Sequence, residues 1–168
     1  ELSENLKILD SKGEKVLLIG VSFALLDLIE HNKFDLKNTI IMETGGMKGR
    51  RKELIRDELH QKLKDGFGVT KIHSEYGMTE LLSQAYSKGN GVFRSPPWMK
   101  ILIRDPENAL EIFPHNKTGG INIIDLANFN SCSFIATDDL GKTHIDNTFE
   151  VLGRFDHSDI RGCNLLIS

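Results

Sequence analysis

Short apolar runs divide the first half of the chain, and turn-forming or charged residues close each run. Continuous apolar runs of this length are typical of buried strands, whereas half-exposed strands alternate apolar and polar positions. This pattern predicts strands over residues 15–20 and 39–42, and the strand-like stretch at residues 69–73, with Val69 and Ile72, predicts a third.

Helical spacing occupies the two intervals between these runs. We expect one helix over residues 23–32, with Ser22 as a candidate N-cap. A second helix is expected over residues 50–65, because apolar residues from Ile55 to Leu63 recur every four positions and share one face. The order strand, helix, strand, helix, strand predicts a parallel sheet with crossover helices.

The second half of the chain changes to short strand patterns separated by turn signals, which favours a small antiparallel sheet or barrel. The strands expected in this half cover residues 99–104, 120–125, 132–137 and 148–153. The predicted fold class is therefore α/β. A three-layer parallel-sheet lobe over residues 1–92 is followed by a small antiparallel β lobe over residues 93–168.

The composition is that of an ordinary globular protein. The chain has 168 residues, of which 39% are hydrophobic and 27% charged, and its formal net charge is −3. This balance favours no nucleic-acid partner, and no apolar run reaches the roughly 18 residues that span a membrane. The cysteines, Cys132 and Cys163, form no CxxC motif, so we expect a reducing, cytoplasmic setting and no zinc site.

Two polar segments directly follow predicted strands. In open parallel sheets, ligands bind beyond the carboxyl ends of the strands, and both Gly45-Gly46 and the segment from Tyr76 to Glu80 fall there. The glycine pair is either a plain loop or a backbone wall that a flat ring can approach closely.

The sequence Tyr-Gly-Met-Thr-Glu at residues 76–80 gathers groups that suit a nucleotide. Tyr76 offers an aromatic face to a purine, and Gly77 allows the backbone to approach a ligand. The Thr79 hydroxyl can donate to a phosphate, and the Glu80 carboxylate can bind Mg²⁺ through oxygen. Each residue alone is more often a packing or solvated side chain, and Glu80 falls at an expected strand-to-helix turn. Their joint spacing favours the nucleotide interpretation.

The second half carries two further candidates. Asp138 and Asp139 either form a β-turn or supply a carboxylate whose two oxygens accept from a ribose diol. Arg154 either pairs with a nearby aspartate on the surface or contacts phosphate or ribose oxygens through its guanidinium group.

Cys163 is a candidate nucleophile near the carboxyl end. A lone cysteine is most often a small buried hydrophobe. Gly162 precedes this one, however, and Arg154 and Arg161 are close in sequence. Neighbouring cations lower the pKa of a thiol and favour the nucleophilic thiolate.

Taken in order, these motifs resemble the core motifs of the adenylate-forming enzymes, the acyl- and aryl-CoA ligase superfamily. The subgroup that the chain resembles most is that of the LuxE-type acyl-protein synthetases, the fatty-acid-activating components of a bioluminescence reductase complex. The segments that carry this resemblance are Met42 to Gly46, Ser74 to Gln84, Leu152 to Arg154 and Arg161 to Cys163.

The resemblance implies ATP as cofactor and assigns roles around it. The glycine pair Gly45-Gly46 would border the nucleotide and Tyr76 would stack on adenine. Thr79 would contact phosphate, Asp139 the ribose diol, and Arg154 ribose or phosphate.

It also implies the chemistry at the acid and the metal. A carboxylic acid, expected to be a fatty acid, would attack the α-phosphate of ATP to give acyl-AMP, with Mg²⁺ bound by Glu80. The acyl group would then move to a thiol, which in LuxE-type proteins is a cysteine near the C-terminus, here Cys163. An acyl-accepting reductase is the partner that the subgroup implies.

Departures from the superfamily keep alternatives open. Its upstream Ser/Thr/Gly-rich phosphate loop is missing, so the chain resembles the C-terminal half of a longer enzyme. The chain reads Thr137-Asp138-Asp139 where the superfamily has Thr-Gly-Asp, so either aspartate is a candidate for ribose. The lid domain with its catalytic lysine is also missing, as in LuxE-type proteins. An acyl- or aryl-CoA ligase fragment and a non-catalytic nucleotide-binding or interaction module remain alternatives.

Overall fold

The computed structural model describes residues 1–45 and 54–155. These residues divide into two compact units. Unit 1 comprises Glu1–Thr79 and Gln84–Phe93, and unit 2 comprises Glu80–Ser83 and the chain from Arg94 onward.

Unit 1 is built on a parallel sheet with helices beside it. Its elements in chain order are α1 (Leu2–Ser11), β1 (Val16–Val21), α2 (Ser22–His31), β2 (Thr39–Thr44), α3 (Arg56–Phe67), β3 (Ile72–Tyr76), β4 (Ala85–Ser87) and β5 (Val92–Arg94). Strands β1, β2 and β3 run parallel, and β4 pairs with β3 in the antiparallel sense. The expected strand–helix repeat and its parallel sheet are confirmed.

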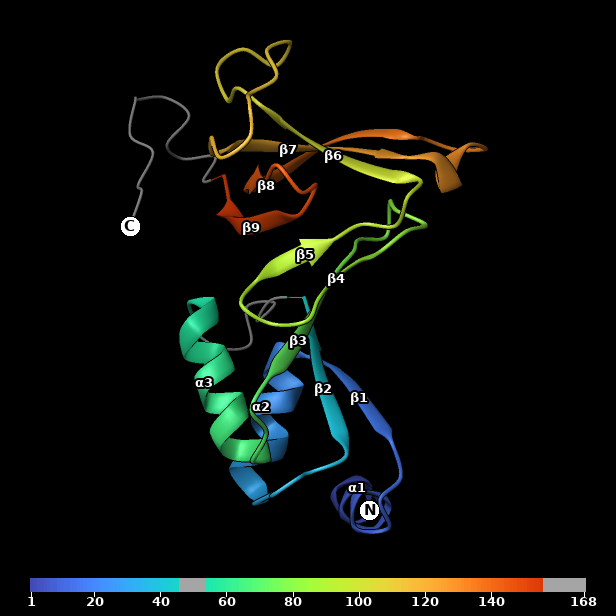
Figure 1. Cartoon of the computed structure of the whole chain (residues 1–168), viewed down its shortest axis with the longest axis vertical. Coiled ribbons are helices and arrows are strands. Elements are labelled where there is room, and N and C mark those ends of the chain that lie inside the picture. Colours follow the sequence, from blue (N-terminus) through green and yellow to red (C-terminus); the bar gives the residue numbers. More distant parts are fainter. Residues whose placement is uncertain (46–53, 156–168) are drawn as a thin grey trace. The chain divides into compact units, whose positions relative to one another are not determined.

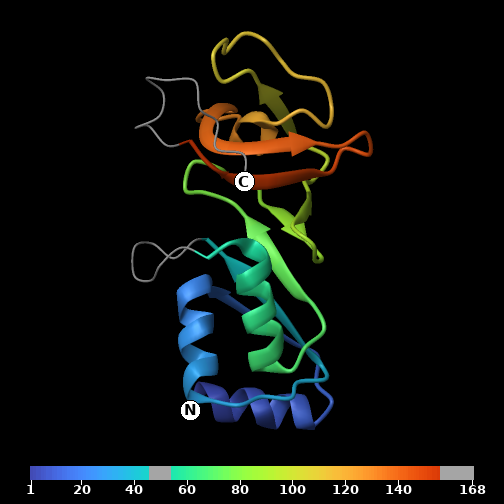
Figure 2. The ribbon, with the colours of Figure 1, turned by 90° about the vertical axis from the view of Figure 1, so that its left-hand side faces the viewer.

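The core of unit 1 lies between the sheet and helices α2 and α3, which lie side by side over one face of β1–β3 (Figures 1 and 2). Ile41 and Leu63 are completely buried there. On the other face, Leu17, Ile19 and Ile40 are about half exposed. Of the three layers expected, the described residues thus supply the sheet and one helical layer.

Two helix boundaries differ from the sequence predictions. The described helix α3 begins at Arg56, and Ile55 is its N-cap and 74% exposed, so the apolar face continues from Leu59 to Phe67 instead. Gly68 ends this helix in the left-handed conformation (φ 70°) that glycine adopts without strain. Ser22 is the first residue of α2 and not its cap, because its hydroxyl bonds elsewhere.

Unit 2 contains an antiparallel sheet, as expected for this half. Its elements are β6 (Met99–Arg104), β7 (Gly119–Asp125), the short 3₁₀ helix η1 (Leu126–Asn128), β8 (Phe134–Thr143) and β9 (Phe149–Arg154). The strand order is β9-β8-β7-β6 (Figure 1), and each neighbouring pair is antiparallel. The core side of β7 carries Ile121 and Ile123, which are at most 1% exposed.

Candidate functional site

The Tyr-Gly-Met-Thr-Glu segment begins at the carboxyl end of β3. Tyr76 is the last residue of that strand, and its ring contacts Phe93 edge-on, with centroids 6.1 Å apart. Thr79 and Glu80 are exposed. The next regular element is β4, so the expected strand-to-helix turn at Glu80 is wrong. The segment is thus a loop that leads into an antiparallel strand.

Gly77 is needed for room rather than for an unusual backbone angle. A Cβ at this position would lie 2.4 Å from Oε1 of Glu75. The other oxygen of that carboxylate accepts a hydrogen bond from the Thr44 hydroxyl at the end of β2. The Glu75 side chain therefore joins the ends of β2 and β3 while lying against the backbone of the motif glycine.

Gly45 follows β2 in the left-handed conformation, with φ 66°, which favours glycine at this turn. Its carbonyl accepts a hydrogen bond from the Ser22 hydroxyl at 2.7 Å. Ser22 also lies 3.2 Å from Oε2 of Glu43, and Oε1 of Glu43 lies 3.4 Å from Nε2 of His60. That same nitrogen is 3.4 Å from the Ser74 hydroxyl. We call Ser22, Glu43, His60 and Ser74 the Glu43 cluster.

Sequence reasoning missed the Glu43 cluster, although one signal was present. Residues 39–42 predict a buried strand, and Glu43 extends that strand by one inward-facing position, as Ile41 does two residues earlier. A carboxylate at an inward-facing position requires polar partners. His60 carried no comparable signal, because it lies beside Leu59 on a helix whose face was read from apolar residues alone.

In unit 2, the structure brings Arg154 to both candidate aspartates. Its Nε lies 3.4 Å from Oδ1 of Asp139, and one terminal nitrogen lies 3.8 Å from Oδ2 of Asp138. The Asp139 side chain is 16% exposed and that of Asp138 48%. Of the two alternatives for these residues, the β-turn is wrong, because both lie inside β8, where Asp139 pairs with Arg154 of β9.

Hydrogen bonds between side chains and the backbone around Thr137 hold Asp139 in this strand. The Thr137 hydroxyl donates to the Ile121 carbonyl at 3.0 Å and accepts from the Asp139 N–H at 3.1 Å. Arg104 donates to the Thr137 carbonyl at 2.7 Å. The register shifts between Leu140 and the residue after it, which marks an irregularity beside the aspartate. Such irregularities often re-aim side chains next to functional sites.

A buried aspartate also fixes the residues that follow Glu80. Asp125 is completely buried and accepts hydrogen bonds from the N–H groups of Leu82 and Ser83, at 3.1 and 2.9 Å, and from the Ser83 hydroxyl at 2.7 Å. Burial alone would raise the pKa of Asp125, but the hydrogen bonds from Ser83, Ala127 and Leu82 outweigh it and hold the pKa below its usual value.

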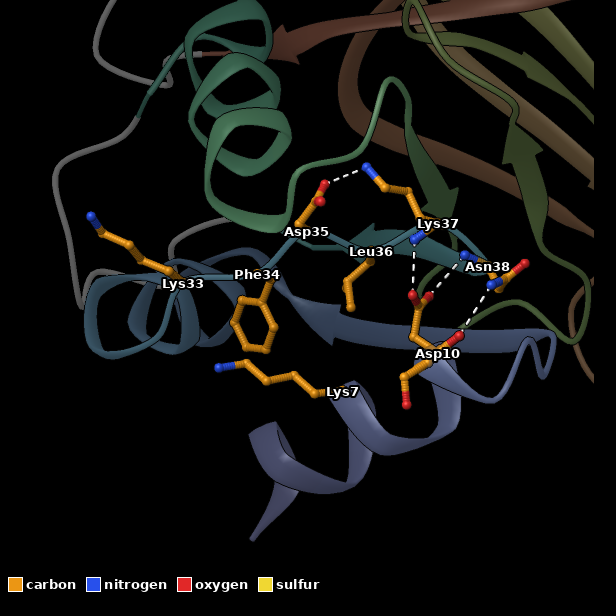
Figure 3. Close-up of a pocket in the computed structure, with 9 residues that line it drawn as sticks. Lys7, Asp10, Lys33, Phe34, Asp35, Leu36, Lys37 and Asn38 are labelled. Carbon is orange, nitrogen blue, oxygen red and sulfur yellow. Dashed lines mark hydrogen bonds and ion pairs between the residues drawn. The ribbon is translucent and has the colours of Figure 1, made fainter.

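A hollow of about 670 Å³ in unit 1 lies away from these motifs, beside α1 and the start of β2 (Figure 3). Within it, Asp10 accepts the backbone N–H groups of Lys37 and Asn38 at 2.9 and 2.8 Å, and Lys7 lies over the Phe34 ring. Burial would raise the pKa of Asp10, yet these bonds and the one from Thr39 hold it below its usual value. The polar groups that line this hollow thus fasten α1 to β2 through the hydrogen bonds of Asp10.

Some predicted positions lie outside the described residues, namely Gly46 and Cys163. Cys132, which is described, is exposed and unpaired with another cysteine. Among the described residues, no three His, Cys, Asp or Glu side chains gather as a metal site would require. The helices of that part of the chain also lack the length and apolar character needed to span a bilayer.

Solved structures identify the class of fold. The chain resembles the ATP-bound MatB from Rhodopseudomonas palustris (TM-score 0.63, 20% identity) over 88% of this chain and 32% of that one. It also resembles coronafacic acid ligase from Pectobacterium brasiliense (0.62, 20%), over 91% and 32%, and a luciferase-like enzyme from the mealworm Zophobas morio (0.58, 19%), over 91% and 41%. The fold is that of the adenylate-forming ligases, and the chain spans about a third of the length of the first two.

The family model for acyl-protein synthetase, LuxE, matches residues 1–168. The chain therefore belongs to the LuxE acyl-protein synthetase family. A comparison with curated proteins gave no match.

Proposed function

We propose that the protein activates a carboxylic acid with ATP and Mg²⁺ and then transfers the acyl group to the thiol of Cys163. The observation that carries this proposal is the match of the LuxE family model along the whole chain. The solved structure of MatB that shares the fold is described as ATP-bound, which supports ATP as the cofactor.

The geometry within each unit supports the proposed nucleotide roles. Tyr76 lies at the end of β3, where its ring would stack on adenine, and Gly45, in the left-handed conformation after β2, would border the nucleotide without a side chain. Asp139 is the better candidate for the ribose diol, because its carboxylate is the more buried of the two and its strand position is fixed by Thr137. Arg154 then orients that carboxylate and reaches ribose or phosphate oxygens.

Two bonds form and two break in the reaction. A carboxylate oxygen of the acid attacks the α-phosphorus of ATP, and the bond to pyrophosphate breaks. The Cys163 sulfur, as thiolate, then attacks the acyl carbon, and AMP leaves with the electron pair. The exposed Thr79 and Glu80 are the residues that would contact phosphate and Mg²⁺, and the metal and cations would offset charge at the attacked phosphorus.

Intact-mass spectrometry after incubation with a long-chain acyl-AMP tests the acyl transfer. We expect one acyl adduct on the wild type, none on Cys163→Ser, and an unchanged adduct on the matched control Cys132→Ser, which removes the exposed cysteine. An adduct that persists in Cys163→Ser, or that vanishes in Cys132→Ser, would contradict the assignment.

The second candidate is a ligase, as the similar coronafacic acid ligase is named, and here the thiol of CoA would accept the acyl group. In that case acyl-AMP and CoA together yield acyl-CoA while the protein stays unmodified.

Under the leading proposal, an acyl-accepting reductase would take the acyl group from Cys163. A soluble reductase that removes the adduct from the isolated acyl-protein would support that step.

A further inference from the structure

The Glu43 cluster lies directly behind the turn at Gly45. Its members come from four different elements, α2, β2, α3 and β3, and all are buried. The exposed fractions are 1% for Ser22, 8% for Glu43, 6% for His60 and 0% for Ser74. Four polar side chains thus meet next to the hydrophobic cluster of unit 1, which includes Ile41 and Leu63.

Cohesion of the four elements does not require such a cluster. Burying a carboxylate and an imidazole removes both from water, and their mutual attraction only partly offsets that cost. Apolar side chains join the same four elements without that cost, namely Leu25 of α2, Ile41 of β2, Leu63 of α3 and Ile72 of β3. We therefore infer that the Glu43 cluster has a role beyond packing, and that this role lies in its contact with a group outside the cluster.

That contact is the carbonyl of Gly45. The Ser22 hydroxyl has one proton, and its 2.7 Å distance to the Gly45 oxygen is shorter than its 3.2 Å distance to Glu43. Glu43 borders the same hydroxyl and is itself held from the other side by His60. A line of contacts therefore runs from α3 through Glu43 and Ser22 to the backbone of the glycine turn.

We propose that Ser22 and Glu43 are positioning residues that hold the Gly45 carbonyl, so that the backbone at Gly45 is already in place when the nucleotide binds. This inference rests on the proposed function, because it assumes that the turn borders ATP. Glycine loses more conformational freedom on ordering than any other residue. A turn held in advance spares the ligand that cost, which strengthens binding. Neither side chain needs to touch the nucleotide.

Variants of the two residues give the first test, with the dissociation constant of ATP–Mg²⁺ as the readout. Ser22→Ala removes the hydroxyl and should weaken ATP binding about fivefold to tenfold, the range expected for one hydrogen bond. Glu43→Ala should weaken it similarly. Glu43→Gln should restore most of the affinity, because its amide can donate to Ser22 and accept from His60.

Ser87→Ala is the matched control. Ser87 is as buried as Ser22 and also lies in unit 1, but its hydroxyl donates to Gly89 in a different turn. The control should lose thermal stability to a similar extent as Ser22→Ala and keep the wild-type affinity for ATP. Equal loss of affinity in both variants would mean a general effect of destabilisation and would overturn the proposal.

A second readout does not depend on ATP. The sequence has two Gly-Gly pairs, Gly45-Gly46 and Gly119-Gly120, so labelling glycine with carbonyl ¹³C and amide ¹⁵N selects the carbonyls of Gly45 and Gly119. The Gly45 resonance should move in Ser22→Ala and Glu43→Ala and return in Glu43→Gln, while the Gly119 resonance stays in place.

A failure of the proposed function can be distinguished from a failure of the positioning role. If the wild type binds no ATP, the proposed function fails, and the positioning role fails with it. If the wild type binds ATP but Ser22→Ala changes neither the affinity nor the Gly45 resonance, only the positioning role is overturned.

Discussion

At the scale of the residue, neighbours on one strand have different surroundings. Asp138 and Asp139 are adjacent in β8, and both reach Arg154. Their side chains differ threefold in exposure, 48% against 16%. The sequence could not choose between them, because it showed only two carboxylates in succession and a turn-like composition. The choice depends on the pleat of β8, which follows from pairing with β9.

The first prediction separates these two aspartates. Asp139→Asn should weaken ATP binding by about tenfold or more, because a hydrogen bond to a charged group is worth roughly 1.5–3 kcal/mol. Asp138→Asn should change the affinity less than twofold, since this more exposed group is largely solvated. Isothermal titration with ATP–Mg²⁺ measures both variants. If Asp138→Asn weakens ATP binding more than Asp139→Asn does, Asp138 and not Asp139 is the residue that binds the ribose.

At the scale of the element, alternation along β2 decides what each side chain contributes. Ile40 and Ile41 are consecutive and chemically identical, yet they are 47% and 0% exposed. Ile41 packs under α2 and α3, whereas Ile40 belongs to the opposite face of the sheet together with Leu17. The run at residues 39–42 predicts a strand correctly, but because residues 40–42 are all apolar the run does not reveal which face of the strand is covered.

The second prediction uses this pair as its own control. Ile41→Ala should destabilise the protein by about 2–5 kcal/mol, because it leaves a cavity in the core. Ile40→Ala should cost no more than about 1 kcal/mol, mainly through the lower strand preference of alanine. Urea denaturation followed by circular dichroism gives both values. Similar losses of unfolding free energy for the two variants would show that the face of the sheet that carries Ile40 is also buried in solution.

The end of α3 supports a third prediction. Gly13 and Gly68 both have φ between 70° and 77°, but a Cβ at Gly68 would lie 2.8 Å from the Asp35 backbone, whereas one at Gly13 meets nothing within 4 Å. Gly13→Ala should cost about 1–2 kcal/mol for the left-handed backbone alone. Gly68→Ala should cost clearly more in the same denaturation experiment, since backbone must also move. Equal losses would refute the contribution of this contact.

Much of the element order could be predicted from the sequence, and the exceptions have physical causes. The strand over Met99–Arg104 was predicted with its bounds, because apolar positions and turn residues agree there. Helix α1 was missed although Leu2, Leu6 and Leu9 recur at helical spacing, and only Leu6 and Asp10 of this helix are buried. The Glu43 cluster could not be predicted as a unit, because its four residues are brought together only by the fold.

At the scale of the whole molecule, the described part of each unit shows a buried aspartate that joins separate segments. Asp10 fastens α1 to β2 in unit 1, and Asp125 fastens Leu82 and Ser83 beside β7 in unit 2. In both, hydrogen bonds to the charged form outweigh the effect of burial and lower the pKa. The ionised carboxylate is therefore favoured in the folded state relative to the unfolded chain.

The fourth prediction is a loss of stability in acid. A group whose pKa is lower in the folded state stabilises the protein above the pKa of the unfolded chain, about 4 for aspartate. That stability is lost as the pH falls through the folded pKa. The contribution of Asp10 and Asp125 to the urea midpoint should therefore be constant from about pH 7 to 5 and decline below about pH 4, whereas the lowered pKa of His73 adds a separate decline below about pH 6.5.

Asparagine variants supply the control for this pH dependence. Asp10→Asn and Asp125→Asn should be less stable than the wild type near neutral pH and should lose less on acidification, because the titrating group is gone. A wild-type decline in acid that both variants reproduce in full would assign the effect to other carboxylates.

The contact between Glu75 and Gly77 has a consequence for how the motif can change over generations. The Glu75 carboxylate occupies the space that a side chain at Gly77 would need, and it also binds Thr44. Alanine at Gly77 alone would displace the carboxylate and break that bond. In a lineage that first shortens Glu75, the same alanine would meet only Cγ of Gln84, at 3.1 Å, and would cost less. The cost of a mutation at one position thus depends on the residue at the other, and so does the order in which the two changes are tolerated.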